Sequence, residues 1–99
     1  MLIIFSGLPG SGKSTISHKL SEQLNAVYIR MDMIEQAIRN AGETVGVSGY
    51  MIAYGLAKDN LDLGNIVVVD SVNPLKITRD AYRDIAITND YPYLELEII

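Results

Sequence analysis

Cysteine is absent from the 99-residue sequence, and histidine occurs only once, as His18. Without cysteine the chain forms neither a disulfide nor a thiolate metal site, and a single histidine does not provide a histidine-based zinc site. We predict a solvated His18 with no catalytic role, because a general base needs positioned partners. The lack of cysteine is consistent with a reducing, cytoplasmic setting, which is the location we expect.

Long hydrophobic runs and an excess of basic residues are also missing. The apolar start, Met1–Phe5, has no basic region and breaks at Ser6-Gly7, so it is too short for a signal peptide or a membrane span. The 12 acidic residues outnumber the 8 basic ones, and the net charge of −4 argues against an extended surface for nucleic acid or anionic membrane. With 48% hydrophobic residues and no internal repeats, the chain is expected to form one domain.

A phosphate-binding motif stands near the start of the chain. Residues 7–14 read Gly-Leu-Pro-Gly-Ser-Gly-Lys-Ser, which matches the P-loop pattern G-x-x-x-x-G-K-[ST]. The apolar run Leu2–Phe5 before the motif predicts a strand. Three apolar residues at helical spacing after it predict a helix that buries this stripe against a sheet: Ile16, Leu20 and Leu24. Strand, loop and helix therefore occur in the order that a P-loop requires.

Each fixed position of the motif has a physical reason. Glycines let the backbone wrap closely around an anion, and the positive end of the following helix points at the same place. Lys13 would reach the β and γ phosphates, and the Ser14 hydroxyl would ligate Mg²⁺. The alternative is a glycine-rich turn without chemistry. The residues that we expect to contact ATP are Gly7, Leu8, Pro9, Gly10, Ser11, Gly12, Lys13, Ser14 and Thr15.

A second strand, predicted over residues 26–30, delivers Asp32 to the edge of the sheet where ligands collect in open α/β folds. There an aspartate would accept or orient the proton of an attacking hydroxyl. The alternative role is an N-cap for a helix beginning near Met33 and stopped by Gly42. Arg30 and Glu35 flank Asp32, and each would either contact substrate or pair with a neighbouring charge.

The stretch Gly42–Gly49 contains three glycines and predicts either a lid over the acceptor or an ordinary helix-to-helix connection. Ser48 is the expected N-cap of the next helix. Its predicted core stripe is Val47, Met51, Tyr54, Ala57 and Leu61. The alternative for Tyr50 and Tyr54, stacking on a base, is less common than core packing at helical spacing.

Residues 66–69 are four β-branched residues in a row, Ile-Val-Val-Val, which is typical of a strand buried on both faces of a parallel sheet. The strand is expected to finish at Asp70. A carboxylate at the end of such a strand beside a P-loop would hold Mg²⁺, as a Walker B aspartate does. The alternative is a polar residue that simply ends the strand.

Asn73-Pro74 predicts the start of a further helix, whose apolar stripe would be Ile77, Ala81 and Ile85. Arg79 would point toward an anionic substrate, or this part of the helix would carry only local salt bridges, such as Arg83 with Asp80 or Asp84. Residues 93–99 alternate apolar and acidic side chains and predict a last strand.

From Leu2 to Ile99 the sequence resembles a group of small P-loop kinases that includes polynucleotide kinases, zeta toxins and related AAA-type ATPase proteins of unassigned activity, with the last as the nearest likeness. The resemblance rests on the P-loop, on Arg30–Arg39, on Gly49-Tyr50, on Val69–Pro74 and on Thr78-Arg79. It implies an α/β fold of the P-loop NTPase type, with three α/β/α layers and a parallel sheet in the strand order 2-3-1-4.

The resemblance also implies ATP-dependent phosphoryl transfer to a hydroxyl of a small or nucleotide-like acceptor, with Lys13 on the phosphates and Asp32 at the acceptor. Glu35 departs from the pattern, because polynucleotide kinases carry arginine there, and an anion contact is lost. Two alternatives remain open: an ATPase or switch module without a dedicated acceptor, and an inactive core.

A second departure is length. Kinases of this group continue past the fourth strand into an arginine-bearing lid, a fifth strand and an adenine-binding loop. We therefore expect residues 1–99 to be an incomplete P-loop core with the fifth strand and lid absent. The unpaired edge of its sheet would favour association with a second copy, unless these residues are a fragment of a longer product.

Overall fold

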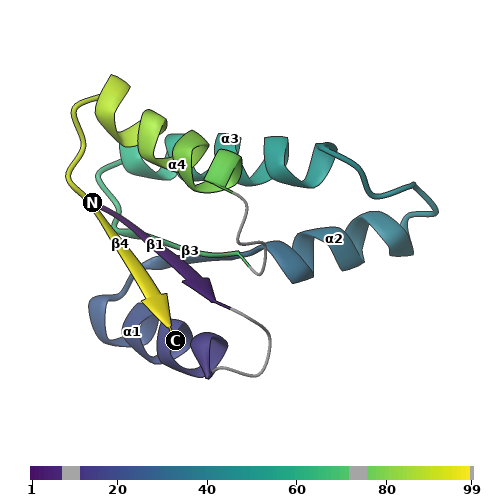
Figure 1. The fold of residues 1–99 in the computed structure, drawn as a ribbon, viewed down its shortest axis with the longest axis horizontal. Helices are drawn as coiled ribbons and strands as arrows, with labels where there is room; N and C mark the ends of the chain where they lie inside the picture. The colour runs from purple at the N-terminus through teal and green to yellow at the C-terminus, as the bar shows by residue number, and fades with distance from the viewer. Residues whose placement is uncertain (8–11, 72–75, 99) are drawn as a thin grey trace.

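The computed structural model describes residues 1–7, 12–71 and 76–98. Strands and helices alternate along most of the chain (Figure 1). In chain order the elements are β1 (Leu2–Gly7), α1 (Lys13–Leu24), β2 (Val27–Arg30), α2 (Met31–Asn40), α3 (Ser48–Asp62), β3 (Val67–Ser71), α4 (Lys76–Thr88) and β4 (Tyr93–Ile98).

The described strands form one parallel sheet in the order β2-β3-β1-β4, which confirms the expected α/β fold and strand order. Phe5 of β1 lies opposite Asp70 of β3 and Leu96 of β4, and Arg30 of β2 lies opposite Asp70. This register brings the ends of β2 and β3 to the same edge of the sheet as the start of the P-loop.

Helices cover both faces of the sheet, with α1 below it and α3 and α4 above it in Figure 1. Because side chains alternate along a strand, Leu2 and Ile4 pack toward α3 and α4, whereas Ile3 and Phe5 pack on the α1 side. All five residues of β3 are buried, as predicted for a strand covered on both faces. The strand runs one residue further than predicted, so Asp70 lies within it.

The predicted apolar stripe of α1 was partly wrong, since Leu20 is the one residue of the three that packs against the core. Ile16 is 46% exposed and Leu24 is 38% exposed, and the buried residues of α1 are Lys13, Ser17 and Ser21. Polar side chains lie against the sheet here because they have partners: Ser17 bonds to Asp70 and Tyr28, and Ser21 donates to the Ser17 carbonyl at 2.7 Å.

The stripe of α3 was partly wrong. Ala57 and Leu61 are buried, but Val47 and Met51 are 78% and 65% exposed. The helix instead buries a row that begins with small residues, which let it approach α2 closely: a Cβ on Gly49 would lie 3.5 Å from the Met31 methyl carbon. The row is Gly49, Ala53, Ala57 and Leu61.

Two other helix predictions also need correction. Ser48 is the first residue of α3 rather than its N-cap, which is Val47. On α4, among the residues whose burial is described, Tyr82 and Ala86 are fully buried, while the predicted Ala81 and Ile85 are partly buried and Ile85 packs against the core. The predicted cap at Asn73-Pro74 lies outside the described residues.

Tyr82→Phe is expected to raise the free energy of unfolding by about 1 kcal/mol, because it removes a buried hydroxyl that has no hydrogen-bond partner among the described residues. Its ring, which meets Tyr54 edge-on at 4.9 Å between centroids, would stay in place. Urea denaturation measures the change, with exposed Tyr93→Phe as the control. A loss of stability in Tyr82→Phe would mean that the hydroxyl is satisfied.

The described part of the sheet has β4 at one edge, where Tyr93 and Leu94 are 40% and 43% exposed. Association of two copies through this edge stays a prediction. Light scattering tests it, and a monodisperse monomer would contradict it. Among the described residues, no helix is long and apolar enough to cross a membrane.

Candidate nucleotide and acceptor site

The structure describes the two ends of the predicted P-loop. Gly7 ends β1, and Gly12 stands at the N-cap of α1 with φ of +85°. That left-handed conformation is strained for residues with a Cβ, which explains glycine at this position. Leu8, Pro9, Gly10 and Ser11 lie outside the described residues. The N-terminus of α1 follows Gly12, and the N–H groups of the first turn of a helix favour an anion.

Lys13 and Asp70 form a buried ion pair at the base of this loop. Each side chain is 4% exposed, and the Lys13 ammonium contacts Asp70 Oδ1. Burial lowers the pKa of Lys13, the charge of Asp32 opposes that shift, and the charge of Arg30 adds to it. These interactions place Asp32 and Arg30 within electrostatic reach of the Lys13 ammonium.

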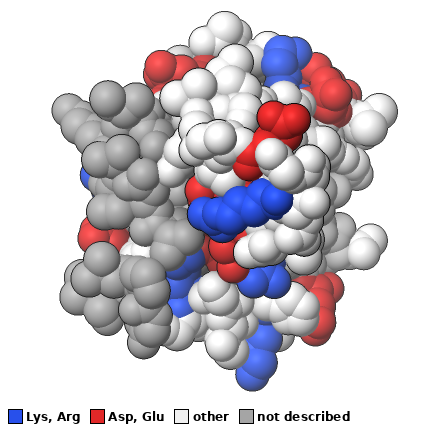
Figure 2. Space-filling view, turned by 90° about the vertical axis from the view of Figure 1, so that its right-hand side faces the viewer, with Lys and Arg blue, Asp and Glu red and all other residues white. Residues whose placement is uncertain are grey.

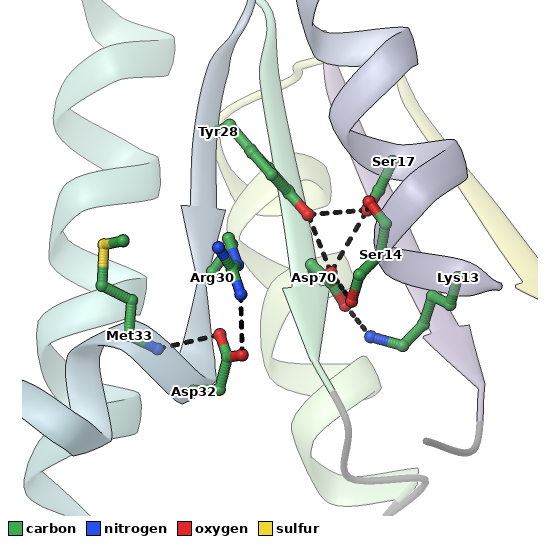
Figure 3. Close-up of polar contacts among 8 residues, drawn as sticks. All are labelled: Lys13, Ser14, Ser17, Tyr28, Arg30, Asp32, Met33 and Asp70. Carbon is green, nitrogen blue, oxygen red and sulfur yellow. Dashed lines mark hydrogen bonds and ion pairs between the residues drawn. The ribbon is translucent and has the colours of Figure 1, made fainter. Parts of the chain in front are cut away.

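The other carboxylate oxygen of Asp70 meets three hydroxyls from two elements (Figure 3). Ser14 and Ser17 of α1 each lie 3.2 Å from Oδ2, and Tyr28 of β2 donates to it at 2.9 Å. Ser14 and Asp70 are the two residues predicted from the sequence as magnesium ligands, and Ser17 and Tyr28 were not predicted. The spacing Lys13, Ser17, Ser21, one residue every fourth position, was the available signal.

The oxygens of Ser14 and Asp70 are of the chemical type that binds Mg²⁺. A hydroxyl and a carboxylate are hard oxygen donors, and a P-loop magnesium ion takes most of its remaining ligands from phosphates and water. Asp70 Oδ1 is buried without a hydrogen-bond partner among the described residues, apart from its ion pair with Lys13. No group of three or more His, Asp or Glu side chains within the described residues is arranged to hold a metal. A dedicated protein cage is thus not formed there.

Asp32 lies on the same edge of the sheet, at the start of α2. The helix begins at Met31, two residues earlier than predicted, with Arg30 at the N-cap position, so Asp32 is in the first turn and is not the N-cap itself. Its Oδ1 accepts the Met33 N–H at 2.8 Å, and its Oδ2 accepts from Arg30 at 2.9 Å. The Asp32 side chain is 55% exposed and open to a ligand.

Two grooves border these residues, and Arg30 lines both of them. The smaller, of about 310 Å³, lies between α1 and β2 beside the P-loop, and the larger, of about 620 Å³, follows α2. The smaller is lined by Ser14, Thr15, His18, Lys19, Tyr28 and Arg30. The larger is lined by Arg30, Asp32, Met33, Glu35, Gln36, Ala37, Arg39 and Asn40. Both volumes fall within or near the usual range for small-molecule sites.

The charges around the larger groove are mixed. Arg30 and Arg39 stand with Asp32 and Glu35, and in Figure 2 acidic and basic side chains are interspersed on the face of the molecule at the right-hand side of Figure 1. Glu35 lines the same groove as Asp32, in agreement with its expected position beside that residue. No charge of one sign dominates this groove.

Arg79 is only partly buried and lines neither of these two grooves. The local salt bridge expected on α4 is confirmed, since Arg83 pairs with Asp80 and also lies 3.3 Å from Glu95 of β4. His18 is 60% exposed and lies 3.5 Å from Glu22, in agreement with the expected solvated side chain. Tyr50 and Tyr54 pack against the core, in agreement with the preference for core packing over stacking on a base.

The fold and this site define a small P-loop kinase-like domain. The AAA domain family matches residues 2–96, so the chain belongs to that family. An adenylyl-sulfate kinase of Picosynechococcus sp. is 29% identical over an alignment that covers 80% of this chain and 49% of the relative. The chain therefore spans about half the length of this curated relative.

Solved structures share the fold. An APS kinase of Mycobacterium tuberculosis, solved in complex with AMPPNP and APS, superposes with a TM-score of 0.79 at 21% identity, over 99% of this chain and 61% of that chain. A gluconokinase of Sinorhizobium meliloti 1021 gives a TM-score of 0.63 at 19% identity, over 96% and 55% of the two chains. At these identities the likeness establishes the fold alone.

Proposed function

We propose that this domain belongs to an ATP-dependent kinase that transfers the γ-phosphoryl group of ATP to a hydroxyl of a small acceptor. The observation that carries the proposal is the convergence of Lys13, Ser14 and Asp70 at the P-loop, with Asp32 on the same edge of the sheet. The adenylyl-sulfate kinase relative and the AMPPNP-bound structure support ATP as the nucleotide.

In this proposal the residues of the chain position charge rather than form covalent bonds. Lys13 leaves Asp70 and binds the β and γ phosphates, and the N-terminus of α1 adds its dipole. Ser14 and Asp70 would hold Mg²⁺, which would supply neutralisation of the charge on the phosphates. These contacts are stronger for the transition state than for the ground state, which is the requirement for catalysis.

Asp32 provides the acid–base step. The acceptor oxygen forms a bond to the γ-phosphorus while the bond from that phosphorus to the β–γ bridging oxygen breaks, and ADP departs. The hydroxyl proton passes to the Asp32 carboxylate, which is exposed and therefore accessible to an acceptor in the groove along α2. The volumes of the two grooves are large enough for a small acceptor.

The experiment is a measurement of ADP release with Mg²⁺ and ATP, alone and with a panel of nucleosides, sugars, sugar acids and oligonucleotides. Acceptor-stimulated release, with a phosphorylated acceptor detected by mass spectrometry, is the expected result. Release that no acceptor stimulates would favour an ATPase or switch module. That second function has one observation in its favour: both oxygens of Asp32 already accept hydrogen bonds within the chain.

A further inference from the structure

Asp70 is held by two hydroxyls that the P-loop motif does not include. Ser17 is fully buried and lies 3.2 Å from Asp70 Oδ2, and Tyr28 donates to the same oxygen at 2.9 Å. The two hydroxyls also lie 2.8 Å from each other. In Figure 3 they approach the carboxylate from α1 and from β2, on the side away from Lys13.

The number of protons on the two hydroxyls limits the hydrogen bonds that they can donate. Each carries one proton, and a carboxylate at neutral pH only accepts. The Tyr28 proton goes to Asp70 or to Ser17, and the Ser17 proton goes to Asp70, to Tyr28 or to the Ser14 carbonyl oxygen, which lies 3.2 Å away. With the Tyr28 proton on Asp70, a Ser17 proton donated to Asp70 or to Tyr28 makes the two hydroxyls one donor unit, in which each bond polarises the next.

The contacts of Asp70 divide into two kinds. In the proposed function, Lys13 turns to the phosphates and Ser14 to Mg²⁺, so their contacts with Asp70 change when the nucleotide binds. That function assigns no phosphate contact to the buried Ser17 or to Tyr28, which lines the smaller groove, so their bonds to Oδ2 can persist. Oδ1, which Lys13 contacts here, then becomes the oxygen available to the metal.

We propose that Ser17 and Tyr28 are positioning residues that clamp Oδ2 of Asp70, so that Oδ1 is presented to Mg²⁺ once Lys13 moves to the phosphates. The proposal rests on the proposed nucleotide site. It extends that site to a hydroxyl pair that neither the P-loop motif nor the Walker B pattern identifies. Partners of this kind fix the orientation of a metal ligand, and their loss weakens metal binding.

A purely structural role for Ser17 and Tyr28 would have different consequences for nucleotide binding. If the pair only satisfied a buried carboxylate, its removal would lower stability and affect nucleotide binding equally with and without Mg²⁺. If the pair orients a metal ligand, its removal affects mainly the part of nucleotide affinity that Mg²⁺ adds. The ratio of the two affinities, measured in one variant, separates these cases because an overall loss of folded protein cancels.

The test measures the affinity of the chain for a fluorescent ATP analogue in excess Mg²⁺ and in EDTA. For Tyr28→Phe, which keeps the ring, we expect the gain from Mg²⁺ to fall about tenfold while affinity in EDTA changes less than about twofold. Ser17→Ala is expected to act in the same direction, and the double variant to lose less than the sum of the two, because the pair is one unit.

Tyr91→Phe is the matched control, since it removes a tyrosine hydroxyl that contacts a carboxylate, Asp62, outside the site. It should leave the gain from Mg²⁺ unchanged. A wild-type gain retained in Tyr28→Phe and Ser17→Ala overturns the inference while leaving the proposed function intact. Affinity lost equally in Mg²⁺ and in EDTA also overturns it. A wild-type chain whose nucleotide affinity does not respond to Mg²⁺ overturns both.

Discussion

Lys13→Ala is expected to lower ATP turnover about 100- to 1,000-fold, the range found when one preorganised donor to a developing charge is removed. Nucleotide affinity should fall about tenfold or more, because a charge-assisted hydrogen bond to phosphate is lost. ADP release and binding of a fluorescent ATP analogue measure the two effects. Unchanged nucleotide affinity would contradict the assignment of this site.

The same substitution has a structural consequence that must be measured in parallel. Lys13 and Asp70 are both 4% exposed, and removal of one partner from a buried ion pair costs about 3–5 kcal/mol of stability. The hydroxyls of Ser14, Ser17 and Tyr28 remain on Asp70 and reduce that cost. Thermal unfolding identifies a variant that is merely unfolded. Lys58→Ala, which removes an exposed lysine of α3, is the control and should change neither binding nor turnover.

Asp32→Asn is expected to lower acceptor-stimulated turnover about 100- to 10,000-fold, the usual contribution of a positioned general base, while nucleotide affinity changes little. Asparagine retains an oxygen for the Met33 N–H, so the start of α2 should be preserved. Steady-state rates with an acceptor found in the panel measure the loss.

A proportional loss of nucleotide affinity in Asp32→Asn would mean that Asp32 acts through Lys13, whose pKa its charge affects. Equal turnover in wild type and variant would contradict the proton-accepting role and favour an acceptor-independent ATPase. Asp84→Asn, on the exposed side of α4, is the matched control and should behave as wild type.

The sequence alone predicted the fold and the residues that lie together at the centre of the candidate site. The P-loop letters and the β-branched run before Asp70 predicted a parallel sheet from local pattern and chain order, whereas the strand order was implied by the resemblance to small kinases. Lys13, Ser14 and Asp70 were assigned in the same way. Asp70 ends one buried parallel strand, and Lys13 and Ser14 follow the loop after another. Chain connectivity therefore constrains all three to the carboxyl end of the sheet, so their positions can be predicted from the sequence.

Tertiary structure decided which helix faces lie against the sheet and which side chains complete the site. Apolar spacing predicted Ile16, Leu20 and Leu24 as the buried face of α1. Leu20 does pack against the core, but Ile16 and Leu24 are exposed, and Ser17 and Ser21 are buried instead. A serine is favourable there only because Tyr28 and Asp70, from strands distant in sequence, supply hydrogen-bond partners. Periodicity reflects the hydrophobicity of each residue but not the hydrogen-bond partners that the tertiary fold brings next to it. The hydroxyl pair around Asp70 was therefore visible only in the folded structure.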